Sequence, residues 1–254
     1  MAVSPLFLVP GIGMILIGVG FVLFWGLKFK PTFRLFLWGA LGWIVGVALK
    51  FIWSYFMNPV IYRSLYTIPY AGKPIMWIYV GLLTGIFEVG VTLLFVRFVT
   101  RLRNANWHEA SAAGIGFGSI EAILLGLGSL IGVIIAIVAP QMIPANVLDA
   151  YRSIGASPVV FTVVPILERF AVIFAHAVSV IWVIYAVRSR KYSWFWYAFL
   201  LKTGLDVLAA YGQLEMDLTK ASNVLLLEAG VVAIGLLSAI LWMSSKRKFG
   251  ELKP

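Results

Sequence analysis

The sequence lacks cysteine and is poor in histidine and in charged residues. Without cysteine the chain can form no disulfide, no thiolate–metal bond and no cysteine nucleophile. Its two histidines, His108 and His176, are too few for a multi-histidine metal site, so we expect no metal or other cofactor. Charged residues make up 12% of the 254 residues, about half the share found in soluble globular proteins. This composition argues against a water-soluble fold.

Apolar side chains are what the sequence has in abundance, at 62% of all residues. A bilayer accommodates them in helices of about 20 predominantly apolar residues each. Seven such runs occur, at about 5–27, 35–57, 75–99, 111–138, 159–187, 193–213 and 222–243. Turn-forming pairs follow several of them, such as Asn58-Pro59 and Ala139-Pro140. The sequence therefore predicts an all-α polytopic membrane protein with about seven spans, forming one transmembrane domain over residues 1–254.

The cations are distributed unequally between the two sides of the predicted bundle. Four lie in the loops of one side, at Arg63, Lys73, Arg152 and Lys220. Thirteen lie on the other side, at Lys28, Lys30, Arg34, Arg97, Arg101, Arg103, Arg188, Arg190, Lys191, Lys246, Arg247, Lys248 and Lys253. The positive-inside rule assigns the richer side to the cytoplasm, which gives an outside N-terminus and a cytoplasmic C-terminus.

This distribution also indicates where the chain resides and what it contacts. Short clusters of three or four cations suit anionic lipid headgroups, and we expect the multi-pass protein to lie in a cell membrane, the plasma membrane of a prokaryote. Nucleic-acid binding would need a continuous basic surface on a folded domain, and no loop offers one. Other membrane subunits or a transmembrane helix remain possible partners.

Charged and titratable residues inside the predicted spans are the candidates for function. A charged side chain at mid-bilayer costs about 2.5–3.5 kcal/mol on insertion scales, so such residues normally face the bundle interior and form pairs. The set comprises Lys50, Glu88, Glu121, Glu168, Arg169, His176, Lys202, Asp206 and Glu228. Lys50 and Glu228 are predicted nearer the outer ends of their spans. The other charged residues lie close to mid-span and hold four acids and two bases.

Helical spacing predicts which of these side chains can meet. Lys202 and Asp206 are four residues apart and are expected to pair. Arg169 and His176 are two turns apart and share a helix face, while Glu168 points towards a neighbouring helix. We expect these groups to line a polar cavity at mid-membrane, although a purely structural role in holding helices together stays open.

Glycines recur four residues apart in several spans, as Gly42/Gly46, Gly114/Gly118 and Gly128/Gly132. The run Gly114-Ile115-Gly116-Phe117-Gly118 superficially resembles a nucleotide-binding loop, but it follows no strand. Small residues at this spacing are typical of close helix packing in membranes, and we interpret them so.

Four segments resemble the YhfC-type family of intramembrane peptidases, which is related to the CAAX-protease and bacteriocin-processing group. They are Gly85-Ile86-Phe87-Glu88, Gly114-Ile115-Gly116-Phe117-Gly118-Ser119-Ile120-Glu121-Ala122-Ile123-Leu124, Leu167-Glu168-Arg169-Phe170-Ala171 and Leu205-Asp206-Val207-Leu208-Ala209-Ala210. The similarity extends over about residues 75–215. It implies a Glu-Glu pair and a downstream Arg that join histidines of later helices to activate a water, in a cavity open to the cytoplasm.

The chain departs from this pattern at four positions. Val89 replaces the second Glu and Thr92 stands where the Arg is expected. Phe117 and Lys202 occupy positions where the resemblance implies histidines. The scaffold therefore looks retained while the catalytic set looks depleted.

Three functions follow as hypotheses. The first is a non-catalytic scaffold, or a ligand- or partner-binding subunit of a membrane complex, which uses the cavity formed by Glu168, Arg169, Lys202 and Asp206. The second is a divergent intramembrane peptidase whose catalytic residues are Glu88, Glu121 and His176. The third is an ion or small-solute transporter component, in which the same charged groups line a path through the membrane.

Overall fold

The computed structural model of the protein describes residues 3–154 and 157–251, and these form helices without any strand. The long helices are α1 (Leu8–Phe29), α2 (Arg34–Leu65), α6 (Trp107–Val138), α8 (Pro158–Ser189), α9 (Ser193–Glu215) and α10 (Ala221–Gly250). A further rod consists of α3 (Gly72–Thr84), the π-helical turn η2 (Gly85–Val89) and α4 (Gly90–Phe98). The short elements are η1 (Pro5–Phe7), α5 (Thr100–Arg103), η3 (Pro140–Met142) and α7 (Ala145–Ile154).

Six stretches of helix are long and apolar enough to cross a membrane, which confirms the all-α polytopic fold. They begin at Pro5, Arg34, Gly72, Trp107, Pro158 and Ala221. The seventh predicted span, 193–213, forms helix α9, but α9 is not among the six. It carries Lys202 and Asp206 near its centre and packs against α3 and α8. The count of seven spans and their orientation stay predictions.

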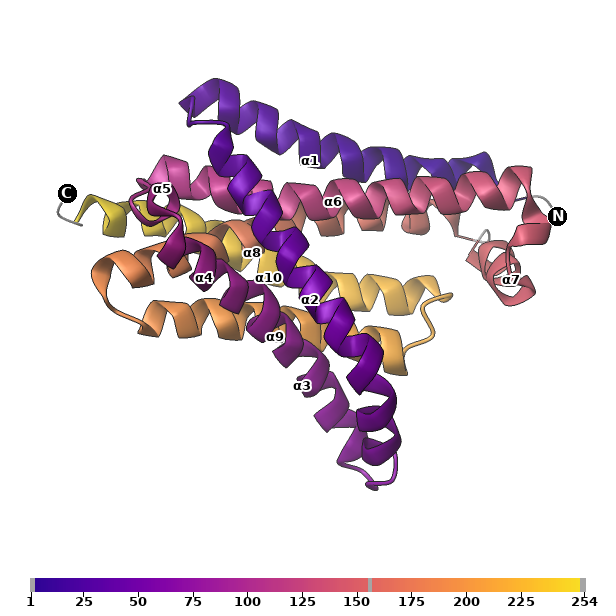
Figure 1. Cartoon of the computed structure of the whole chain (residues 1–254). Coiled ribbons are helices and arrows are strands. Elements are labelled where there is room, and N and C mark those ends of the chain that lie inside the picture. The colour runs from indigo at the N-terminus through magenta and orange to yellow at the C-terminus, as the bar shows by residue number, and fades with distance from the viewer. Residues whose placement is uncertain (1–2, 155–156, 252–254) are drawn as a thin grey trace.

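The helices that surround the functional groups cross at different angles. In Figure 1, α1, α6, α8, α9 and α10 run roughly along one direction, while α2 and the α3–α4 rod cross them diagonally. The hairpin between α2 and α3 projects beyond the other helices. Many side chains in the distal half of α2 are exposed, including Phe51, Tyr55 and Phe56, and they are apolar or aromatic as a lipid-facing surface requires.

One boundary and one short helix differ from the sequence prediction. Asn58-Pro59 was expected to end the second span, but α2 continues through Pro59 to Leu65. A proline inside a membrane helix frees only a few backbone groups, which neighbouring groups can satisfy. Helix α7, which has Val147 and Leu148 among its residues, was not predicted at all. By contrast, Ala139-Pro140 does end α6.

Glycines bring α6 against α2 and α8. The predicted pair Gly114/Gly118 makes the contact with α8, whereas the contact with α2 involves Gly39, which lies outside the predicted pairs. A Cβ atom on Gly39 of α2 would overlap the carbonyl oxygen of Ala113, and one on Gly114 would lie 2.5 Å from the Cα of Ala177. The pair Gly128/Gly132 does not follow this prediction, because a Cβ on Gly128 would meet nothing within 4 Å. The first part of α6, which carries the glycine-rich motif, packs closely against α2 and α8, and Gly126 in its second half packs against Gly11 of α1.

The cation-rich segments gather at one end of the bundle. Figure 1 shows the α1–α2 connection, α5, the α8–α9 turn and the C-terminus at the left, whereas the N-terminus, α7 and the α9–α10 connection lie at the right. Lys253, which the prediction counted with the C-terminal cluster, lies outside the described residues. We call the left end the cation-rich end and the opposite one the cation-poor end.

Candidate functional site

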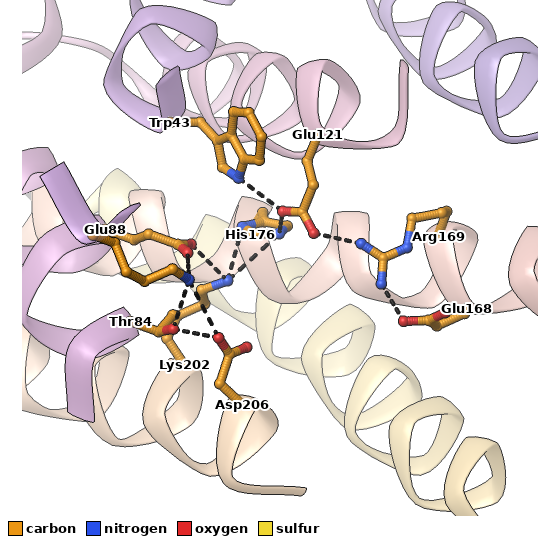
Figure 2. A network of polar contacts seen from close by, with 10 residues as sticks. Trp43, Thr84, Glu88, Glu121, Glu168, Arg169, His176, Lys202 and Asp206 are labelled. Carbon is orange, nitrogen blue, oxygen red and sulfur yellow. Dashed lines mark hydrogen bonds and ion pairs between the residues drawn. The ribbon is translucent and has the colours of Figure 1, made fainter. Parts of the chain in front are cut away.

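Polar side chains from five long helical segments meet in the interior of the bundle (Figure 2). We call them the polar network. Its members are Trp43 and Lys50 of α2, Thr84 of α3, Glu88 of η2, Glu121 of α6, Glu168, Arg169 and His176 of α8, and Lys202 and Asp206 of α9. The structure thus brings together all the candidate residues predicted near mid-span and adds Lys50 to them, whereas Glu228 lies outside the network.

Glu88 occupies a π-helical turn, a local widening that occurs often at functional positions in helices. Its carboxylate lies between two ammonium groups: Oε1 is 2.8 Å from Nζ of Lys50 and Oε2 is 3.1 Å from Nζ of Lys202. Glu88 is only 4% exposed, and Lys202 only 3%. Ammonium groups on both sides stabilise the buried carboxylate charge.

Glu121 is held by three donors. Nε1 of Trp43 donates to its Oε2 at 2.9 Å, and Nε2 of His176 lies 2.7 Å from the same oxygen. The guanidinium of Arg169 donates to Oε1. The sequence predicted that Arg169 and His176 share a helix face, and their common partner Glu121 confirms it. Glu168 accepts a hydrogen bond from Arg169 beside it, and its carboxylate lies within electrostatic reach of Glu228 on α10.

His176 connects the two carboxylates through Lys202. Nζ of Lys202 is 3.2 Å from Nδ1 and 3.5 Å from Nε2 of the imidazole. Because these distances are nearly equal, the ammonium lies towards the face of the ring and not along the lone pair of one nitrogen. The ring of Phe117 packs on His176 with 5.0 Å between centroids. The two positions where the resemblance implies histidines, 117 and 202, therefore both contact His176.

The predicted pair between Lys202 and Asp206 does not form. Lys202 turns to Glu88 and His176, whereas Asp206 lies 3.5 Å from Nζ of Lys50 and accepts a hydrogen bond from the hydroxyl of Thr84. Both residues share a face of α9, but each finds an opposite charge on another helix. Spacing within one helix shows which ion pairs are possible but does not show which of them form.

The prediction from the sequence gave one member of the network, Lys50, the wrong depth and omitted two others, Trp43 and Thr84. Lys50 was expected near an outer end of its span, apart from the midplane groups. Because α2 crosses the bundle diagonally, position along this helix does not translate directly into depth. Nζ of Lys50 donates to Thr84 Oγ1 at 3.0 Å as well as to Glu88. Trp43 and Thr84 are uncharged, so no charge pattern in the sequence could have indicated them.

With Lys50 included, the network holds four acids and three bases, a better balance of charge than the four acids and two bases predicted.

Glu228, the remaining charged residue of the predicted set, is half-buried on α10. Its Oε2 atom is buried and accepts no hydrogen bond from the described part of the chain. Glu228 is therefore not held by the network.

A cavity of about 550 Å³ adjoins the network. Lys50, Glu88, Glu121, Arg169 and Asp206 are among the charged residues that line it. Apolar residues from several helices complete its walls, among them Val47, Leu83, Leu125, Val172 and Leu205. The cavity is therefore amphipathic, with charges gathered at one end.

The cavity extends towards the cation-poor end. Its lining follows α2 to Asn58 and Tyr62 and α9 to Gln213, and both helices run from the cation-rich to the cation-poor end. On the other side of the network, buried apolar residues such as Val96 and Phe117 fill the space between helices. The resemblance implied an opening on the side predicted to be cytoplasmic, whereas the lining of this cavity continues towards the opposite, cation-poor end.

A metal ion would find no suitable site among these groups. No group of three or more histidine, aspartate or glutamate side chains within residues 3–154 and 157–251 could hold one. The potential ligands Glu88, Glu121 and His176 each contact a cationic side chain, and the ammonium of Lys202 occupies the place between Glu88 and the imidazole. The ammonium would repel a metal ion placed between Glu88 and His176. The imidazole lone pairs of His176 also do not point to that position.

Comparison with known proteins agrees with the resemblance in the sequence. The family model of the YhfC intramembrane metalloproteases matches residues 13–229, a longer stretch than the similar segments span. No curated protein and no solved structure matches the chain. Since the family model covers most of the sequence, the chain belongs to the YhfC intramembrane metalloprotease family.

Proposed function

We propose that this chain is a non-hydrolytic member of its family, a membrane protein that binds a ligand in the amphipathic cavity. The observation that carries the proposal is the position of the Lys202 ammonium, 3.1 Å from the Glu88 carboxylate and 3.2 Å from the His176 ring. A covalently attached cation therefore occupies a position where the resemblance implies a histidine.

Metal-dependent hydrolysis needs an ion that has an open coordination position for water, because the ion activates the attacking water. An ammonium group offers no such position. Phe117 also removes one of the imidazoles that the resemblance implies, and it packs on the His176 that remains. The residues present do not fit a catalytic metal, so the proposal includes no metal-dependent step.

Metal-free hydrolysis would need a carboxylate that can take a proton from water. The carboxylate of Glu88 lies between Lys50 and Lys202, and that of Glu121 is held by Trp43, Arg169 and His176. Both oxygens of Glu121 accept hydrogen bonds, whereas Oε2 of Glu88 accepts none and is only ion-paired with Lys202. Cations beside both carboxylates favour their charged forms and so make them weak general bases. This supports a structural role for both acids.

With hydrolysis set aside, ligand binding in the cavity is the function that the site supports. A volume of about 550 Å³ is within the usual range of small-molecule sites, roughly 300–1,000 Å³. Its charged end and apolar walls suit an amphipathic ligand whose polar group reaches the network. Because the lining continues to Asn58 and Gln213, we expect the ligand to enter from the cation-poor end.

Peptidase activity of Glu88→Gln and wild-type protein tests the proposal. Purified wild type should not cleave transmembrane or prenylated peptides, and the variant should behave the same. Removing a true general base would lower turnover by about 10²–10⁴-fold. Cleavage by wild type that Glu88→Gln abolishes would refute the proposal and establish the divergent peptidase instead.

Cysteine labelling tests the cavity and its opening. The chain has no cysteine, so Ser54→Cys and Gln213→Cys can be labelled without background. Both should react with a membrane-impermeant maleimide added from the cation-poor side. Val96→Cys, on the closed side of the network, is the buried control and should not react. Labelling of Gln213→Cys only from the cation-rich side would contradict the proposed entry route.

A further inference from the structure

A second cavity, separate from the polar network, lies between α1, α8 and α10. Its volume is about 480 Å³ and every residue that lines it is apolar or glycine. Phe21 and Phe24 of α1, Phe170 and Phe174 of α8 and Trp242 of α10 contribute the aromatic walls. We call it the aromatic groove. The function proposed above does not use it.

The length of the aromatic groove matches one leaflet of a bilayer. Along α1 its lining extends from Leu16 to Trp25, which corresponds to about 14 Å at 1.5 Å per residue. The hydrocarbon core of a bilayer is about 30 Å thick, so one leaflet is about 15 Å. Gly20 widens the groove, because a Cβ atom there would meet nothing within 4 Å. A single acyl chain fits these dimensions.

Two lysines lie at the cation-rich end of the groove. Lys28 is one helical turn beyond Phe24, and its Nζ lies 5.1 Å from the centre of the Phe24 ring. Lys246 is one turn beyond Trp242, and its Nζ lies 5.6 Å from the ring of Trp107, which stacks on Trp242. Helices α1 and α10 both run towards the cation-rich end, so the two lysines reach the same end (Figure 1). Neither forms an ion pair with a carboxylate of the described residues.

We propose that the aromatic groove is a binding site for an anionic phospholipid of the cation-rich leaflet. One acyl chain lies in the groove, and the phosphate lies at the ammonium groups of Lys28 and Lys246. The length of the groove selects a leaflet-spanning chain. The two unpaired cations select a net negative headgroup over a zwitterionic one, whose own cation they repel.

Native mass spectrometry of the full chain in mild detergent tests this site. After delipidation, phosphatidylglycerol and phosphatidylcholine with identical acyl chains are added in turn. Wild type should retain one phosphatidylglycerol in preference to phosphatidylcholine. Lys28→Gln/Lys246→Gln should reduce this preference about thirty-fold, the effect of two surface lysines on an anionic lipid. Lys191→Gln/Lys248→Gln removes two charges at the same end without touching the groove and should leave the preference unchanged.

Filling the groove gives a second, independent test. Gly20→Leu places a side chain into open space, so it should fold normally and exclude the acyl chain. Gly26→Leu is the matched control, because Gly26 also has open space around its Cβ position but does not line the groove. Loss of the bound lipid in Gly20→Leu alone supports the site. Equal lipid retention by both variants, or equal binding of the two lipids by wild type, overturns it.

Discussion

Replacing Lys202 by methionine should destabilise the protein strongly. The substitution preserves length and apolar volume but removes the ammonium that lies 3.1 Å from Glu88. Breaking a buried ion pair by removing one partner costs about 3–5 kcal/mol, because an uncompensated charge stays buried. Glu88 keeps Lys50 at 2.8 Å, which reduces the loss, so we expect a value near the lower limit of that range.

A double-mutant cycle identifies the partner. Lys202→Met/Glu88→Gln should regain much of the lost stability, because it removes both charges while Lys50 keeps Asp206 at 3.5 Å. Lys202→Met/Asp206→Leu should regain none, since Asp206 does not contact Lys202. Reversible unfolding in mixed detergent micelles measures these differences. Lys73→Met is the control, because Lys73 pairs with Glu215 at the surface and its loss should have little effect. Rescue by Asp206→Leu and not by Glu88→Gln would refute the arrangement of charges described here.

Three further predictions follow from the topology, the site and the packing. Single cysteines at Thr32 and Ser189 should react only from the cytoplasmic side and one at Asn146 only from outside; labelling of Thr32 and Asn146 from the same side would end the proposed orientation. Phe117→His/Lys202→His should bind about one zinc ion per chain by elemental analysis after dialysis, whereas wild type should bind none; equal zinc content would contradict the role assigned to Lys202. Gly39→Ala should lower stability by about 1–3 kcal/mol, because its Cβ overlaps the Ala113 carbonyl, whereas Gly128→Ala should lower it less or not at all; thermal unfolding in detergent compares the two, and equal melting points would argue against that contact.

The sequence predicts the helices well because a long apolar run by itself indicates a helix in an apolar environment. The run at 111–138 lies within α6, and the run at 159–187 lies within α8. An apolar run does not indicate where a neighbouring helix stabilises a proline or a charged residue inside a span. Helix α2 passes through Pro59, and α9 tolerates two charges at its centre because residues of other helices pair with them.

The candidate site could be predicted in its membership but not in its pairing. A charge inside an apolar run is visible in the sequence, and all those predicted at mid-span join the network. Their partners depend on the rotation and tilt of each helix, which a single sequence does not specify. Lys202 and Asp206 illustrate this: their spacing allowed a pair, yet each is closer to an opposite charge on another helix. Trp43 carries no charge, and only its position beside Glu121 reveals its role.

The proposed loss of hydrolysis and the retention of the fold have the same physical origin. A cluster of four buried or partly buried carboxylates needs positive charge nearby, whether a metal ion or side chains supply it. Lys202 supplies that charge as part of the chain, together with Lys50 and Arg169, so the bundle needs no bound ion to remain compact. An ammonium, however, is not a Lewis acid and cannot activate a bound water as a metal ion does. Its contact with His176 also leaves the ring no free approach to a metal. A histidine-to-lysine change at this position would therefore abolish chemistry while preserving the electrostatics on which the helix packing depends. The amphipathic cavity would stay open for binding.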